Sequence, residues 1–289
     1  MVSETGLPYF VYELLAADEI HLLEILPGKG ADKIFCRLRH ALPNDCPTYE
    51  GLSYVWGTSG PTHSVIILSN NGEQYRFPIS QNLSDALHCL RDSPTSRTLW
   101  IDALCINQVD DAEKSSQVIR MKSTFENASR TIVFLGPGEE PNHEIVEFIR
   151  HIDSIDEDSL PNIHAVFTRM NINDHPAHSI CGVPGTHMLI TRFCSIPWWT
   201  RVWVAQEVAV ARNVLVVWGS HTFDWGSCTH AIDILENYTA YLVHNNDDEE
   251  TCKAWEPINT VILQARAVAV ASKWYKDQGI DLKDLLYLF

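Results

Sequence analysis

The sequence is short of basic residues and has no long apolar run. Its 289 residues include 21 Lys and Arg against 37 Asp and Glu, which gives a formal net charge of −16 with histidine neutral. Duplex nucleic acid and anionic membrane surfaces both attract basic faces, so the acidic balance disfavours both as partners. No segment approaches the roughly 18 consecutive apolar residues of a membrane-spanning helix. The first residues also lack the basic and apolar regions of a secretory signal, so we expect a cytoplasmic protein without a membrane span.

The sequence also lacks the cysteine, histidine and glycine patterns of several common sites. Its eight cysteines form no C-x-x-C pair, and without a secretory signal they are expected to be free and mostly buried. A P-loop, a G-x-G-x-x-G after a strand, H-E-x-x-H and G-x-S-x-G are all absent. His175, His178 and Cys181 have side chains that zinc accepts, but their spacing matches no standard zinc site, so we favour a polar loop and predict no metal site. A cysteine hydrolase that uses Cys105 with a histidine from residues 175–187 has no supporting spacing.

What the sequence does contain between residues 49 and 218 is an alternation of strand and helix patterns. Apolar runs predict strands, and apolar residues at i, i+3, i+4 and i+7 predict helices. The order is strand, hairpin, helix, strand, helix, strand, helix, strand, which indicates a parallel sheet with helices on both faces. Strands are predicted at residues 49–56, 65–68, 74–79, 99–106, 131–135 and 214–218. One predicted helical face consists of Leu83, Ala86, Leu87 and Leu90.

Further elements extend this pattern at both ends. Residues 9–40 predict an N-terminal pair of strands, and Asn70-Asn71-Gly72 is a strong signal for a hairpin turn. Asp110 is expected to cap a helix, with Glu113 at the capping-box position. That helix is expected to bury Val118, Met121, Phe125 and Ala128. Another helix is predicted from Pro197 to about residue 211, and two more are predicted after residue 227.

A single carboxylate, Asp102, lies in the apolar run at residues 99–106. A buried carboxylate is costly unless it is paired or hydrogen-bonded. Ligands of parallel sheets bind at the carboxyl ends of the strands, where Asn107 and Gln108 are expected to lie. Two interpretations stay open: these residues line a binding site, or Asp102 caps loop amides and Asn107 makes a turn.

The segment Arg201-Val202-Trp203-Val204-Ala205-Gln206-Glu207 is a second candidate. On a helix, Trp203 and Glu207 are one turn apart. A carboxylate beside a tryptophan on a partly buried face is desolvated and can be poised for chemistry. The alternative, favoured on these residues alone, is an amphipathic helix in which Glu207 pairs with Arg201 or Arg212.

Three blocks of the sequence, taken in order, resemble the HET domain, the heterokaryon incompatibility domain of filamentous fungi. They are residues 49–57 (YEGLSYVWG) with Asn82-Leu83 and Ala86-Leu87, residues 99–108 (LWIDALCINQ) and residues 201–207 (RVWVAQE). The resemblance covers about residues 20–220. We therefore expect one HET-type domain over residues 1–289, with an irregular insertion at 153–190 and a helical C-terminal extension at 227–289.

The resemblance has implications for both fold and activity. HET domains are implicated in a cell-death response to fusion with a non-self strain, a form of innate immunity. They are considered distant relatives of TIR domains, which implies an α/β fold with a flavodoxin/TIR-like parallel sheet flanked by helices, an added N-terminal β-hairpin region and C-terminal helices. Many TIR domains cleave NAD at the nicotinamide glycosidic bond with a glutamate in a W-C-x-x-E pattern. Glu207 is then the expected catalytic residue, although Val204 stands in place of the cysteine.

The chemistry of this cleavage needs few groups. The transition state resembles an oxocarbenium ion, which one carboxylate can stabilise, and nicotinamide leaves without a general acid. Tyr54 or Trp56 is expected to stack on a ring of NAD, and Arg201 to meet a phosphate. The full set expected to bind the nucleotide is Ser53, Tyr54, Trp56, Gly57, Asp102, Asn107, Arg201 and Trp203. NAD is the expected substrate, and no permanently bound cofactor is expected.

A second interpretation is a non-catalytic module that self-associates and recruits partners, as adaptor TIR domains do. Trp56, Trp203 and Asp102 are then packing and hydrogen-bonding residues, and the charge of Glu207 is dispensable. TIR enzymes commonly complete their sites between protomers, so the resemblance implies a homo-oligomer under both interpretations.

Overall fold

The computed structural model describes residues 6–16, 18–42, 46–91, 94–138, 146–147, 149–150, 191–245 and 249–279. The chain divides into two compact units. The first unit consists of Met1–Gly138 and Val210–Thr222, and the second consists of Glu139–Ala209 and Phe223–Phe289. The single HET-type domain over residues 1–289 stays a prediction.

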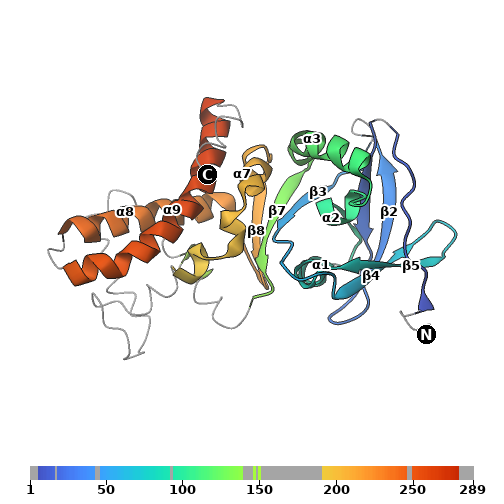
Figure 1. The fold of residues 1–289 in the computed structure, drawn as a ribbon, viewed down its shortest axis with the longest axis horizontal. Helices are drawn as coiled ribbons and strands as arrows, with labels where there is room; N and C mark the ends of the chain where they lie inside the picture. Colours follow the sequence, from blue (N-terminus) through green and yellow to red (C-terminus); the bar gives the residue numbers. More distant parts are fainter. Residues whose placement is uncertain are drawn as a thin grey trace. The chain divides into compact units, whose positions relative to one another are not determined.

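The first unit is built on a mixed sheet (Figure 1), whose strand order is β5-β4-β2-β1-β6-β3-β7-β8-β9. The neighbouring strands β6, β3, β7 and β8 are parallel, and β2 and β4 are parallel. β1 is antiparallel to β2 and β6, and β4 is antiparallel to β5. The strands are β1 (Ile20–Ile25), β2 (Phe35–Ala41), β3 (Glu50–Tyr54), β4 (His63–Leu68), β5 (Gln74–Ile79), β6 (Arg97–Trp100), β7 (Arg130–Gly136), β8 (Val214–Trp218) and β9 (His221–Asp224).

The predicted parallel sheet is therefore confirmed only for the four strands from β6 to β8. The predicted N-terminal strand pair exists, but it lies within the same sheet because β1 pairs with β6. Almost every residue of β1 is buried, so the strand needs neighbours on both edges and cover on both faces. The short connection between β1 and β2 permits only an antiparallel pair, since a parallel pair needs a crossover of about a dozen residues or more.

The apolar run at residues 99–106 is not one strand, contrary to the prediction. β6 ends at Trp100, and Asp102–Cys105 forms a helical turn, α2. The Asp102 side chain accepts a hydrogen bond from the Ala103 amide, and the Cys105 amide donates to Ile101 O. An acidic side chain stabilises the first turn of a helix. Apolar periodicity alone cannot separate a buried strand from a buried helical turn, which explains the error.

The two long helices of the first unit agree better with the sequence. α1 (Gln81–Arg91) buries the predicted face, and α3 (Asp111–Asn127) begins after Asp110, whose side chain accepts from the amides of Ala112 and Glu113. The prediction of a capping box is wrong at Glu113, because the Glu113 side chain accepts a hydrogen bond from the Asn107 amide (2.9 Å). α1 and α3 lie on opposite sides of β3 and β7 (Figure 1). Met121, Phe125 and Ala128 are buried as predicted, Val118 is half-buried, and Gln117 and Thr124 are buried in addition.

The middle of the sheet is held by close contacts around β3. Glu50 accepts hydrogen bonds from Arg97 and Arg130, which lie at the starts of the two neighbouring strands. At Gly51, a Cβ atom would lie 2.7 Å from the ring of Phe125 in α3. The absence of a side chain at this position therefore lets α3 pack directly on β3.

The second unit is helical where it is described. Its elements are η3 (Pro197–Thr200), α7 (Val202–Ala209), α8 (Trp225–Asn245) and α9 (Glu249–Gln278). The predicted helix after Pro197 is interrupted at Arg201 and ends at Ala209. Its core includes Trp198, Trp199 and Trp225, and the rings of the last two are stacked with centroids 6.1 Å apart. The predicted irregular segment at 153–190, with His175, His178 and Cys181, lies outside the described residues.

Three general findings concern the described residues as a whole. None of the described helices combines the length and the apolar character that a membrane-spanning helix needs. No group of three His, Cys, Asp or Glu in this part of the chain could hold a metal ion. As predicted, none of the described cysteines is in a disulfide; they are Cys36, Cys46, Cys89, Cys105, Cys194 and Cys228.

Candidate functional site

Trp56 and Asp102 form a hydrogen-bonded pair at the carboxyl ends of two neighbouring strands. Trp56 follows β3 and Asp102 follows β6, and these strands are parallel, so their carboxyl ends meet at one edge of the sheet. The indole Nε1 of Trp56 donates to both carboxylate oxygens of Asp102, at 3.1 and 2.9 Å. Trp56 is 40% exposed and Asp102 is half-buried. The carboxylate therefore fixes an aromatic ring that remains open to solvent.

A side chain of α1 holds the loop that follows β3. Gly57 has φ +85°, a left-handed conformation that favours glycine, and Asn82 Nδ2 donates to Val55 O (3.0 Å). The two residues before this loop, Ser53 and Tyr54, are buried in β3, with 1% and 2% of their surface exposed. Nucleotide contacts by Ser53, Tyr54 and Gly57 stay predictions.

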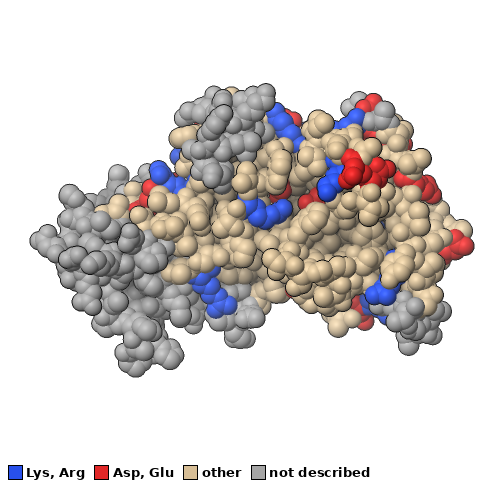
Figure 2. All heavy atoms as spheres, viewed as in Figure 1, with Lys and Arg blue, Asp and Glu red and all other residues tan. Residues whose placement is uncertain are grey.

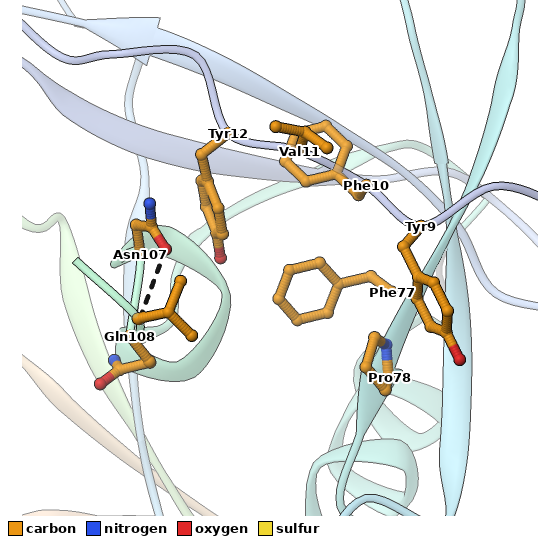
Figure 3. A pocket seen from close by; sticks show the side chains of 9 residues that line it. Tyr9, Phe10, Val11, Tyr12, Phe77, Pro78, Asn107 and Gln108 are labelled. Carbon is orange, nitrogen blue, oxygen red and sulfur yellow. Dashed lines mark hydrogen bonds between the residues drawn. The ribbon is translucent and has the colours of Figure 1, made fainter.

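Asn107 and Gln108 lie in the wall of an open groove of about 400 Å³ (Figure 3). Gln108 Nε2 donates to Asp102 O (2.9 Å), so this wall is joined to the turn that carries Asp102. Figure 3 shows the rings of Tyr12 and Phe77 directed toward the groove from the N-terminal segment and from β5. The other lining residues are Tyr9, Phe10, Val11, Pro78 and Val109.

Two residues that no sequence pattern indicated, Tyr12 and His21, hold the carbonyl groups at the end of α2. The Tyr12 hydroxyl donates to Leu104 O (3.0 Å) and lies 3.4 Å from Ile106 O. His21 Nδ1 lies 3.3 Å from Cys105 O and 3.9 Å from Glu113 Oε1. Both of these oxygens accept hydrogen bonds, so we assign the proton of the neutral ring to Nδ1. The only sequence signal was polar atoms within the apolar segments 10–12 and 20–23.

His21 makes stability depend on pH. Burial is the larger cause, and the neighbouring His40 the next, that lower the pKa of His21 from 6.5 to about 4. The Cys105 carbonyl and Glu19 favour the charged ring and offset part of this shift. At pH values between these two pKa values, the unfolded chain therefore binds more protons than the folded chain. We expect the free energy of unfolding to fall by at most about 3 kcal/mol as the pH drops from 6.5 to 4.

Urea titrations of the wild type and of His21→Asn across this pH range test the prediction. Asparagine keeps a donor near the position of Nδ1 but gains no proton. His88→Asn is the matched control, because His88 Nδ1 also lies near a backbone carbonyl, Gly30 O (3.0 Å). An equal loss of stability with pH in His21→Asn and the wild type would contradict the assignment to His21.

The remaining predicted residues belong to the second unit. Arg201 lies between η3 and α7, Trp203 in the first turn of α7 is 49% exposed, and Glu207 is buried, with 2% exposed. Trp203 and Glu207 were predicted to share one face of the helix, but Trp203 is exposed to solvent and Glu207 is buried. Arg212, one of the partners considered for Glu207, donates to Glu126 O in the first unit (3.1 Å). The structure therefore joins Trp56, Asp102 and the 107–108 loop within the first unit, and Arg201, Trp203 and Glu207 belong to the second unit.

Charges on the face drawn in Figure 2 are mixed. Figure 2 shows acidic and basic side chains interspersed with large uncharged areas on the visible face of the described residues. A ligand at the Trp56–Asp102 pair would meet an aromatic ring and one carboxylate, which is a chemistry suited to a planar ring with hydrogen-bond donors.

Comparisons with known proteins agree with the resemblance of the sequence blocks. The family model described as "Heterokaryon incompatibility protein (HET)" matches residues 49–207, which include Trp56, Asp102 and Glu207. The chain is 25% identical over 238 residues to "Heterokaryon incompatibility protein 6, OR allele" of Neurospora crassa, a match that covers 73% of this chain and 35% of that protein. The chain thus spans about a third of the length of this curated relative. No solved structure matches the chain. Since the family model covers more than half of the sequence, the chain belongs to the heterokaryon incompatibility (HET) family.

Proposed function

We propose that the chain acts in heterokaryon incompatibility, triggering cell death after non-self recognition, and that it does so by TIR-like cleavage of NAD at the nicotinamide glycosidic bond. The family membership supports the first part. The observation that carries the second part is the Trp56–Asp102 pair at the carboxyl edge of the parallel strands. Sites of α/β sheets for nucleotides lie at this edge.

The order of the parallel strands supports a nucleotide site at this place. Numbered along the chain, β3, β6, β7 and β8 are the first to fourth parallel strands, and they lie in the order 2-1-3-4. Flavodoxin-like sheets share this order, and their ligands bind beside the first strand, where the order reverses. Trp56 follows that first strand.

Each residue has a defined part in the proposed reaction. Trp56 stacks on a ring of NAD, and Asp102 holds the indole in place. Glu207 stabilises the positive charge that develops on the ribose as the bond to nicotinamide breaks, and water then attacks the same carbon. Because Glu207 is buried, the proposal requires that NAD binding or self-association opens its surroundings.

The second candidate is a non-catalytic module that self-associates in cell-death signalling. The burial of Glu207 favours it, and so does the exposure of Val202 and Trp203 at the start of α7. Exposed apolar side chains next to one another are typical of interaction surfaces.

Nicotinamide release from NAD by the purified chain tests the enzyme against this alternative. We expect release that rises more steeply than in proportion to protein concentration, since an assembled site needs more than one copy. A chain that releases no nicotinamide at any concentration, including as a fused tandem dimer, would contradict NAD cleavage and favour the adaptor.

A further inference from the structure

The turn α2 cannot be stable by itself. It has four residues, too few to offset the cost of starting a helix, and the last carbonyl groups of any helix lack partners within it. Here side chains supply those partners. Tyr12 donates to Leu104 O and lies near Ile106 O, and His21 Nδ1 donates to Cys105 O.

The Tyr12 hydroxyl is itself held in place by the N-terminal segment. Pro8 O and Phe10 N pair with the backbone of Arg76 in β5, which fixes the segment beside the sheet. The Tyr12 ring makes edge contacts with Phe10 (5.3 Å between centroids) and Phe77 (5.9 Å). It also lies against His21 (5.4 Å). Burial, followed by the neighbouring Cys105 and Glu113, raises the pKa of the phenol, so the hydroxyl keeps the proton that it donates.

We infer that Tyr12 and His21 are positioning residues for the Trp56–Asp102 pair, acting through the carbonyl end of α2. Asp102 is the first residue of this turn, and hydrogen bonds from Ile106 N and Gln108 Nε2 to Asp102 O connect it to the far end. A displacement of the carbonyl end therefore moves the carboxylate that fixes Trp56. Both positioning residues precede residue 49, where the family match begins. The inference rests on the proposed function only in treating this pair as the nucleotide site.

The test is the indole N–H resonance of Trp56 in protein labelled with 15N-tryptophan, assigned by its loss in Trp56→Phe. Tyr12→Phe keeps the ring but removes the hydroxyl. We expect it to move the resonance toward that of a solvent-exposed indole and to speed its exchange with water. Tyr75→Phe is the matched control, because Tyr75 contacts the same Phe10 ring but donates to Glu73 Oε2 (2.9 Å). We expect no change in this control.

Substitutions at His21 provide a second readout. His21→Asn retains a donor near Nδ1 and should preserve the Trp56 resonance at pH 7, whereas His21→Leu should move it. If the two residues have only a structural role, Tyr12→Phe and His21→Leu will lower the melting temperature and leave the Trp56 resonance in place. That result would overturn the inference. An equal shift in Tyr12→Phe and Tyr75→Phe would overturn it as well.

The activity assay separates this inference from the proposed function. If the chain cleaves NAD, Tyr12→Phe should raise KM about tenfold with a smaller change in kcat, as expected when one hydrogen bond that positions a binding residue is lost. If the chain cleaves no NAD, the proposed function fails, but the Trp56 resonance still decides whether Tyr12 and His21 position the pair.

Discussion

A Glu207→Gln protein is expected to release nicotinamide from NAD at least about 100-fold more slowly than the wild type. The loss of a single group that stabilises transition-state charge costs about this much. Glutamine has nearly the same volume as glutamate, so the packing around this buried position in α7 changes little. The measurement is the initial rate of nicotinamide release at saturating NAD, with thermal melting to confirm that the variant is folded.

Glu236→Gln supplies the matched control for this experiment. It makes the same substitution in α8 of the same unit, at a carboxylate that pairs with Arg266. We expect the control to retain most of the wild-type rate. A folded Glu207→Gln protein with the wild-type rate would refute the catalytic role of Glu207 and leave the adaptor as the better account of α7.

The second large effect is expected in the core, where Gly51→Val should lower the free energy of unfolding by about 3 kcal/mol. A Cβ at this position would lie 2.7 Å from the Phe125 ring, closer than atoms can approach, so either the ring or α3 must move. Overpacking of a dense core typically costs about 1–3 kcal/mol, and a rigid ring leaves little room for a cheap adjustment. Equilibrium urea unfolding measures the change.

Gly60→Val is the control for the core substitution. Gly60 is exposed, its backbone is not left-handed, and a Cβ there has no neighbour within 4 Å among the described atoms. We expect a change within about 0.5 kcal/mol, as for most surface substitutions. Similar losses for the two variants would mean that contact with Phe125 is not the cause.

Local patterns predicted the elements of this fold better than they predicted the pairing between them. The β4–β5 hairpin was identified because Asn70-Asn71-Gly72 specifies its own turn, and Gly72 indeed has φ +86°. The start of α3 was identified because Asp110 caps it through neighbours in sequence. The pairing of β1 with β6 was missed because it depends on contacts about 75 residues apart, which no local pattern records.

The candidate site shows the same division. Asp102 and Trp56 were both selected, but their hydrogen bonds follow from the register of β3 against β6, which the sequence does not state. Tyr12 was missed because its partner carbonyls are 92 and 94 residues away. The burial of Glu207 was missed because spacing along α7 places residues on a face but does not say how deeply that face is covered.

The connection between β7 and β8 has a consequence for the order of events during synthesis. These strands are neighbours in the sheet, yet residues 137–213 separate them along the chain. While the ribosome makes that stretch, the apolar strand β7 has no partner on one edge, and an unpaired apolar edge invites pairing with other nascent chains. This edge of β7 is paired only when the segment up to Trp218 has emerged, and the first unit is complete only after Thr222. A cell that makes this protein must therefore protect a half-finished sheet while it translates the whole first segment of the second unit, Glu139–Ala209.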